Sequence, residues 1–239
     1  MFQKFTDDMQ VAKAVAARIA EHLQNKPESL ICIAGGDTPK RTMQEMIRMH
    51  REGEADFSKA YFVGLDEWVG LGRETHGSCV QTLYDGLFEP LLLRDEQICF
   101  FDGKAADLKA ECARIDAFIA ERGGIDFILL GVGMNGHIGF NEPGIEPDQD
   151  AHIVPLDSVT KEVMSKYFET DLPLTQGISL GMRQILAARE IIVIATGAKK
   201  ADIMHQVATE APTAEIPATL LKPVQAATFY LDEAAGARV

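Results

Sequence analysis

The chain has 239 residues, of which 46% are hydrophobic and 25% charged, values that are ordinary for a folded protein and exclude a disordered or fibrous one. A formal net charge of −13 argues against nucleic acid as a partner, because Lys and Arg contacts to phosphates supply most of that affinity, although a locally positive pocket can still bind a small anion. The first twenty residues contain Asp7, Asp8 and Arg18, and no apolar run approaches about 18 residues, so we expect no signal peptide, no membrane contact and a cytoplasmic location.

Helical patterns and short apolar runs alternate along the chain. Apolar residues recur at helical spacing over 11–23, and a buried strand is predicted over 29–34. Thr38 as N-cap and Pro39 at the first helical position predict a second helix, which is followed by a strand over 60–65. The rest of the chain predicts, in order, a helix over 108–119, a strand over 125–130, a strand over 190–195, a helix over 199–208 and a strand over 227–231.

These strands lack the polar alternation of a half-exposed sheet, and helices separate them. Both features indicate a parallel sheet that is covered on both faces. We therefore predict an α/β fold with a Rossmann-like, open and mostly parallel sheet and helices on both faces. We also predict a single domain over residues 1–239, since no linker, repeat or low-complexity segment divides the chain. Such a sheet binds its ligand beyond the carboxyl ends of its strands.

The loop after the first of these strands is rich in glycine and leads into a helix. It contains Gly35, Gly36 and Thr38. Glycines allow a ligand to approach the backbone closely, and a helix start offers unpaired N–H groups, so the loop is a candidate phosphate cradle. A plain tight turn is the alternative. The triphosphate-binding pattern GxxxxGK[ST] is absent, which argues against a nucleoside triphosphate.

Two adjacent acids, Asp66 and Glu67, follow the next strand beside the only tryptophan, Trp68. An acid in a partly apolar cleft can have the raised pKa that a general base needs near neutral pH. The alternative is that an acid here caps a helix.

The loop after the strand at 125–130 begins with a GxGxxG pattern over 131–136. A dinucleotide site is disfavoured, because Gly139 and Pro143 interrupt the long helix that such a site requires, and no well-formed strand ending in an acid follows about 20 residues later. A glycine-rich turn that presents His137 and Glu142 remains, which is typical of an acid–base group steered by a carboxylate. No further ligands at matching spacing indicate a metal, and the scattered cysteines favour buried free thiols.

Two segments resemble the signature stretches of the glucosamine-6-phosphate deaminase (isomerase) family: residues 65–71 (LDEWVGL) and residues 131–143 (GVGMNGHIGFNEP). The order and spacing of the other loops also fit that family, through to residues 195–200 (ATGAKK), so the resemblance covers nearly the whole chain. The related 6-phosphogluconolactonases share the fold and a Gly-His pair but do not continue into Phe-Asn-Glu-Pro.

The resemblance implies a site and a reaction. Asp66 would be the base that moves a proton between C2 and C1 of the opened sugar, and His137 would accept and return protons during ring opening, oriented by Glu142. Asn135 would belong to the same catalytic group. The products of glucosamine 6-phosphate and water would be fructose 6-phosphate and ammonia, with no organic cofactor and no metal. The substrate phosphate would be bound by Gly35, Gly36, Thr38, Lys166 and Lys200.

Three positions depart from the family pattern. Asn135 stands where members from enteric bacteria have Asp, and because Asn takes up no proton at neutral pH, its role would be hydrogen bonding. Asp37, in the candidate phosphate loop, would repel a phosphate unless it points away. Lys166 and Tyr167 replace the usual Arg and Phe, and Lys lacks the bidentate fork of Arg. The sugar epimer therefore stays open between glucosamine and galactosamine 6-phosphate.

A 6-phosphogluconolactonase-like hydrolase is the enzymatic alternative, and a sugar-phosphate-sensing domain is the non-enzymatic one. Such sensors carry a helix-turn-helix segment, for which a sheet starting by about residue 29 leaves no room. Some longer family members are hexamers activated by N-acetylglucosamine 6-phosphate, which basic residues bind shortly after the Asn-Glu-Pro stretch. Here residues 148–154 include Asp148 and Asp150 and no Lys or Arg, so we expect a monomer or small homo-oligomer without that activation.

Overall fold

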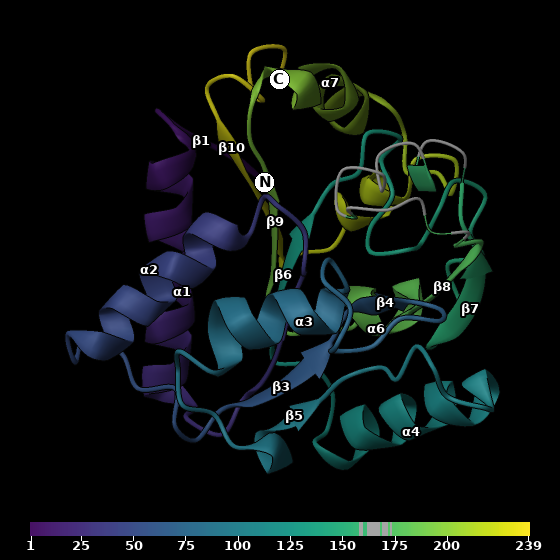
Figure 1. Ribbon diagram of the computed structural model, residues 1–239. Coiled ribbons are helices and arrows are strands. Elements are labelled where there is room, and N and C mark those ends of the chain that lie inside the picture. Colours follow the sequence, from purple (N-terminus) through teal and green to yellow (C-terminus); the bar gives the residue numbers. More distant parts are fainter. Residues whose placement is uncertain (158–159, 162–167, 169–171, 173) are drawn as a thin grey trace.

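Seven parallel strands form the central sheet of the computed structural model (Figure 1). Every pairing in this sheet is parallel, which confirms the predicted α/β fold. The structure describes residues 1–239 except 158–159, 162–167, 169–171 and 173, so the predicted phosphate ligand Lys166 lies outside the described residues. Across the sheet the strands follow the order β1 (Phe2–Phe5), β10 (Ala227–Asp232), β9 (Ile191–Ala195), β6 (Phe127–Gly131), β2 (Leu30–Ile33), β3 (Tyr61–Gly64) and β5 (Ile98–Cys99).

Helices cover both faces of this sheet, as predicted. The described helices are α1 (Asp8–Asn25), α2 (Lys40–Arg51), α3 (Cys79–Leu83), α4 (Leu108–Glu121), α6 (Met182–Leu186) and α7 (Ala201–Thr209), with a π-helical turn η1 (Tyr84–Phe88) and the 3₁₀ turns η2 (Asp95–Gln97), η3 (Ala198–Lys200) and η4 (Pro217–Leu221). Along β2, Ile31 and Ile33 join the apolar cluster that includes α1 and α2, whereas Leu30 and Cys32 join the cluster that includes α4, α6 and α7. Burial on both faces explains why the strands carry no polar alternation. Within the described residues, no helix has the length and apolar character needed to cross a bilayer.

A second, smaller sheet was not predicted. It is antiparallel and consists of β4 (Asp66–Trp68), β8 (Gln176–Ser179) and β7 (His152–Pro155), in that order, on the side of the molecule away from α1 (Figure 1). The chain passes directly from β3 to β4 at Leu65, whose carbonyl accepts a hydrogen bond of 2.8 Å from the amide of Leu180. Asp66 therefore stands at the junction of the two sheets.

One prediction about a chain segment is wrong, and one early strand was not predicted. Helix α2 begins at Lys40, and Pro39 occupies the capping position with no side-chain hydrogen bond, so Thr38 is not the N-cap. The amide of Met43 bonds the carbonyl of Pro39 at 2.9 Å. The strand that was not predicted is β1 (Phe2–Phe5), which forms an edge of the sheet and precedes the first predicted strand, at 29–34.

The first strand of the chain, β1, is held in the sheet by the last described strand, β10. β1 pairs with β10 in a register that places Phe2 beside Phe229, and the two rings stack with centroids 4.7 Å apart. The Nζ of Lys4 donates to the carbonyl of Val239 at 2.5 Å. Both ends of the described chain thus lie at the same edge of the sheet (Figure 1).

Candidate active site

Four loops singled out from the sequence follow neighbouring strands of the sheet. They come after β9, β6, β2 and β3, which are adjacent in that order. The register places Ile33 of β2 between Leu129 of β6 and Gly64 of β3, so all these strands end at nearly the same level. Because the strands are parallel, their following loops meet at one edge, where an open α/β sheet binds its ligand.

Asp66 is the acid that faces this edge. Its carboxylate is nearly buried, with 9% of the residue exposed. The loop after His137 packs closely on it: Gly139 has a φ of +58°, and a Cβ added there would lie 3.3 Å from Asp66 Oδ2. Burial raises the pKa of Asp66 to about 6, with a hydrogen bond to Cys79 and the charge of His137 opposing the rise. A carboxylate that titrates in this range can act as a base near neutral pH.

Glu67, the adjacent acid, points the other way. It is fully buried, and its carboxylate accepts backbone hydrogen bonds from Trp68 at 2.8 Å, Cys79 at 3.1 Å and Val80 at 2.8 Å. Burial raises the pKa of Glu67 to about 7 against the effect of these three N–H donors. The helix-capping alternative raised for this acidic pair therefore applies to Glu67, which ties the start of α3 to β4.

His137 is presented by a turn that needs its glycines. A Cβ at Gly133 would lie 2.4 Å from the His137 ring, and Gly136 has a φ of +83°, a conformation that favours glycine. The amide of Gly133 donates to the carbonyl of His137 at 2.9 Å and closes the turn. The described residues after Gly136 contain no helix until Thr160, in agreement with the exclusion of a dinucleotide site.

A hydrogen-bonded network surrounds the His137 ring. Its Nδ1 lies 3.3 Å from Glu142 Oε2 and 3.3 Å from the hydroxyl of Thr160. Asn135 donates through Nδ2 to Glu142 Oε2 at 3.1 Å and accepts the His137 amide on its Oδ1 at 3.2 Å. Burial raises the pKa of Glu142, but the hydrogen bonds from His137, Thr160 and Asn135 outweigh burial and hold the pKa below its usual range. Glu142 is therefore an anion that can orient and charge-stabilise the imidazole.

The candidate phosphate loop lies beside this network. The Nζ of Lys200, at the end of η3, donates at 2.5 Å to the carbonyl of Val132, the first residue after β6, and β6 is the neighbour of β2 in the sheet. In that loop a Cβ added at Gly36 would meet no atom within 4 Å, which leaves its backbone approachable. The carboxylate of Asp37 lies 2.9 Å from the Nζ of Lys40, so this acid has a cationic partner at the start of α2.

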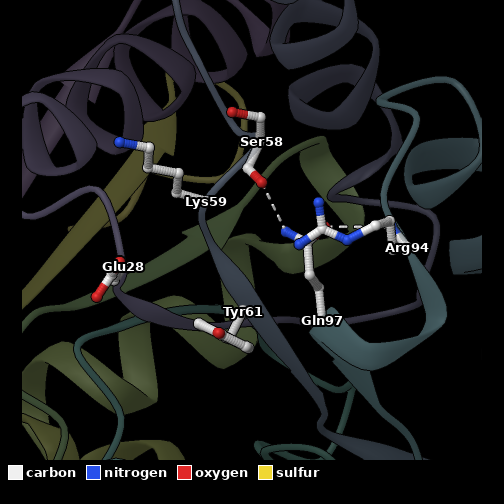
Figure 2. A pocket seen from close by; sticks show the side chains of 6 residues that line it. All are labelled: Glu28, Ser58, Lys59, Tyr61, Arg94 and Gln97. Atoms are coloured by element: carbon white, nitrogen blue, oxygen red, sulfur yellow. Dashed lines mark hydrogen bonds between the residues drawn. The ribbon is translucent and has the colours of Figure 1, made fainter.

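A cavity in the described structure lies away from these loops. Figure 2 shows the side chains that line it. They come from the starts of β2, β3 and β5, so the cavity lies at the opposite ends of the strands from the candidate site. Its volume is about 300 Å³, and it is lined by Glu28, Ser58, Lys59, Tyr61, Arg94 and Gln97. The amide of Gln97 is already used, since it donates to the carbonyls of Ser58 and Ala60 at 3.0 and 2.7 Å and accepts from the amide of Arg94. The polar side chain of Gln97 in the wall of this cavity therefore stabilises the fold.

Sequence reasoning missed two side chains of the site, Cys79 and Thr160. Cys79 contacts Asp66 from 13 positions later, and Thr160 contacts His137 from 23 positions later. Neither belongs to a recognisable local pattern. Only the serine before Cys79, which caps α3 by accepting the amide of Gln81, marked a helix start there.

Comparisons with known proteins are consistent with this geometry. A family model described as glucosamine-6-phosphate isomerases/6-phosphogluconolactonase matches residues 7–230. The glucosamine-6-phosphate deaminase of Bacillus pumilus is 35% identical over 98% of this chain and 97% of its own length, and that of Halalkalibacterium halodurans is 36% identical over 97% and 94%. Among solved structures, a monomeric glucosamine-6-phosphate deaminase matches with a TM-score of 0.96 at 28% identity, covering 100% of this chain and 99% of that one. The 6-phosphogluconolactonase of Trypanosoma brucei matches with a TM-score of 0.76 at 20% identity over 100% and 98%, which shows the fold alone.

Proposed function

The chain belongs to the glucosamine-6-phosphate isomerase/6-phosphogluconolactonase family, and from that premise we propose that it converts glucosamine 6-phosphate and water into fructose 6-phosphate and ammonia. It is an enzyme of amino-sugar metabolism, a glucosamine-6-phosphate deaminase like its relatives. The observation that carries the mechanism is the meeting of a buried carboxylate, Asp66, with the loop that carries the hydrogen-bonded pair His137 and Glu142.

Ring opening is assigned to His137. The imidazole accepts the proton of the C1 hydroxyl and returns a proton to the ring oxygen, which breaks the bond between C1 and that oxygen and leaves an aldehyde. Glu142 stabilises the imidazolium that forms in between, and Asn135 holds Glu142 in place through its amide. Asn135 donates a hydrogen bond and takes up no proton, so the proton changes of this step involve only His137 and the carboxylate bonded to it, Glu142.

Isomerisation is assigned to Asp66. The carboxylate removes the proton from C2 of the open amino aldose and delivers it to C1, while the C1 oxygen gains a proton and the C2 amino group loses one. The C1 carbonyl thereby becomes a hydroxymethyl group and C2 becomes an imine. Water then adds to C2 and ammonia leaves. The reaction is redox-neutral and needs neither an organic cofactor nor a metal.

The substrate phosphate is assigned to the loop after β2 and to Lys200. Gly36 offers an approachable backbone, Gly35 precedes it in the same loop and packs against Cys79, and Thr38 offers a hydroxyl. Lys200 supplies a positive charge from η3. Lys166 completes this set as a proposal from the sequence. Asp37 is held by Lys40, and this ion pair reduces its repulsion of a phosphate. We further propose a single cytoplasmic domain that acts as a monomer, as the relative of 28% identity does.

A substrate panel tests the function. The purified chain is incubated with glucosamine 6-phosphate, galactosamine 6-phosphate, unphosphorylated glucosamine and 6-phosphogluconolactone, and ammonia and acid release are followed. Ammonia together with fructose 6-phosphate from the first substrate is expected. Faster ammonia release from galactosamine 6-phosphate would make that epimer the assigned substrate. Acid release from the lactone without ammonia from any amino sugar would overturn the deaminase assignment.

A further inference from the structure

A buried hydroxyl group that the mechanism above does not use lies beside both the strand of Asp66 and the loop of His137. It belongs to Ser179, the last residue of β8, which is paired with Asp66 in the register of the small sheet. Ser179 is fully buried. A Cβ added at Gly139 would lie 3.0 Å from Ser179 Oγ and 3.3 Å from Asp66 Oδ2. The hydroxyl and the proposed base therefore lie against the same stretch of the His137 loop.

The hydroxyl of Ser179 bonds both of these segments. Its Oγ accepts the amide of Phe140 at 3.2 Å. As a donor it faces two carbonyls, that of Leu180 at 3.1 Å and that of Leu65 at 3.4 Å. The directions of these bonds are fixed, because an amide N–H only donates and a carbonyl only accepts. Since Phe140 belongs to the loop of His137 and Leu65 joins β3 to β4, one side chain links the two segments.

Neighbouring bonds hold the hydroxyl in this position. The amide of Leu180 donates to the carbonyl of Leu65 at 2.8 Å, which fixes the end of β8 to the junction of β3 and β4. The Nδ2 of Asn141 donates to the carbonyls of Ile138 and Leu180, each at 2.9 Å. Asn141 thus ties the loop to itself and to the residue after β8. Among these bonds, those of Ser179 are the ones that reach from the loop to the junction.

On the basis of the proposed deaminase reaction, we propose that Ser179 is a positioning residue, whose hydroxyl fixes the loop of His137 relative to the carboxylate of Asp66. Ring opening and the C2 proton transfer act on neighbouring atoms of one substrate, so both groups must be correctly placed on the same bound molecule. A displacement of about 1 Å can lower a rate by about 100-fold. Because other loops are proposed to bind the phosphate, this role concerns the chemical steps and not the affinity for substrate.

Two variants at Ser179 and one matched control test the inference in the whole chain. Ser179→Ala removes the hydroxyl, and Ser179→Thr keeps it. The control is Ser29→Ala, because Ser29 is also fully buried, its Oγ donates to the carbonyl of Lys26 at 2.7 Å, and it precedes β2 at the opposite ends of the strands from the site. For each variant, kcat and KM for ammonia release from glucosamine 6-phosphate and the exchange of solvent deuterium at C2 are measured well below its Tm.

The Ser179→Ala variant is expected to lose about 10-fold or more in kcat, with KM within about twofold of the parent value and C2 exchange slowed to a similar extent. Ser179→Thr should retain most of the parent's kcat. Ser29→Ala should keep the parent's kcat even where thermal unfolding shows a lower Tm. If Ser179→Ala does not fold, Ser179→Cys gives the same comparison, since a thiol is only a weak donor and acceptor.

Three results would overturn the positioning role of Ser179. These are an unchanged kcat in Ser179→Ala, an equal loss of kcat in Ser29→Ala or Ser179→Thr, and a loss that appears in KM alone. A parent enzyme that releases no ammonia from any amino-sugar phosphate would instead reject the deaminase assignment, and the role of Ser179 with it.

Discussion

Replacing Asp66 with asparagine should make the protein more stable and nearly inactive. General-base catalysis typically contributes about 100- to 10,000-fold, so turnover of glucosamine 6-phosphate is expected to fall by about 100-fold or more. Substrate affinity should change little, because the phosphate contacts lie elsewhere. The gain in stability follows from the burial of the carboxylate, which disfavours its charged form.

The size of that gain depends on pH. Burial raises the pKa of Asp66 from 3.8 to about 6. Well below pH 3.8 the group is protonated in both folded and unfolded chains, so it causes no penalty. Well above pH 6 it is ionised in both, and the shift corresponds to about 3 kcal/mol of lost folding free energy at about 1.4 kcal/mol per pH unit. Asp66→Asn should remove that loss, giving about 3 kcal/mol at pH 7.5 and roughly half of it at pH 5.

Urea unfolding of parent and Asp66→Asn at pH 5 and pH 7.5, beside an ammonia-release assay, measures both effects. Asp202→Asn is a suitable control, because that carboxylate is exposed on α7 and its loss should change neither quantity. Near-normal turnover in Asp66→Asn would remove Asp66 from the mechanism. A stability difference that stayed the same at both pH values would refute the account of its burial.

Three further outcomes are expected. His137→Gln should lower turnover of the cyclic substrate by about 100-fold or more and lower turnover of a substrate analogue locked in the open form much less. Equal losses of turnover for both would contradict a ring-opening role. Lys200→Ala should raise KM by at least about 10-fold with kcat nearly kept, whereas the exposed neighbour Lys199→Ala should not, and equal effects would reject Lys200 as the phosphate ligand. Initial rates should depend hyperbolically on substrate concentration and should not respond to N-acetylglucosamine 6-phosphate. The stretch that would hold the phosphate of this activator carries two acids, Asp148 and Asp150, which form ion pairs with Arg183 at 2.8 and 2.7 Å, so no basic cluster is formed there. A sigmoidal curve made hyperbolic by that ligand would contradict this.

The five inner strands of the central sheet, β10, β9, β6, β2 and β3, could be predicted because they are largely buried, whereas the edge strands β1 and β5 could not. The run at 125–130 is apolar apart from Asp126 and corresponds to β6 (Phe127–Gly131), whose bounds differ from the prediction by two residues at the start and one at the end. The antiparallel sheet could not be predicted, since β4 is three residues long and two of them are acids, which local propensity disfavours in a strand. Its pairing with β8, more than a hundred positions away, stabilises it instead.

Part of the candidate site could likewise be predicted from the sequence, and part could not. Asp66, Asn135, His137 and Glu142 were recognisable because they stand in two continuous segments at strand ends. The direction in which each acid of the pair at 66 and 67 points was not, because it depends on the backbone N–H groups at the start of α3, a dozen positions later. The Cys79 contact is likewise a product of long-range packing.

The pairing of β1 with β10 also sets the order in which the molecule can be completed during synthesis. Phe2 emerges first, yet its register partner is Phe229, 227 positions later. At about 5–20 residues per second, the first strand waits roughly 10–45 s for that partner. Until β10 is made, β9 has an open edge of Ile and Val residues, which is the kind of strand that pairs with other chains. A chain truncated before β10 is therefore expected to be prone to aggregation through this edge.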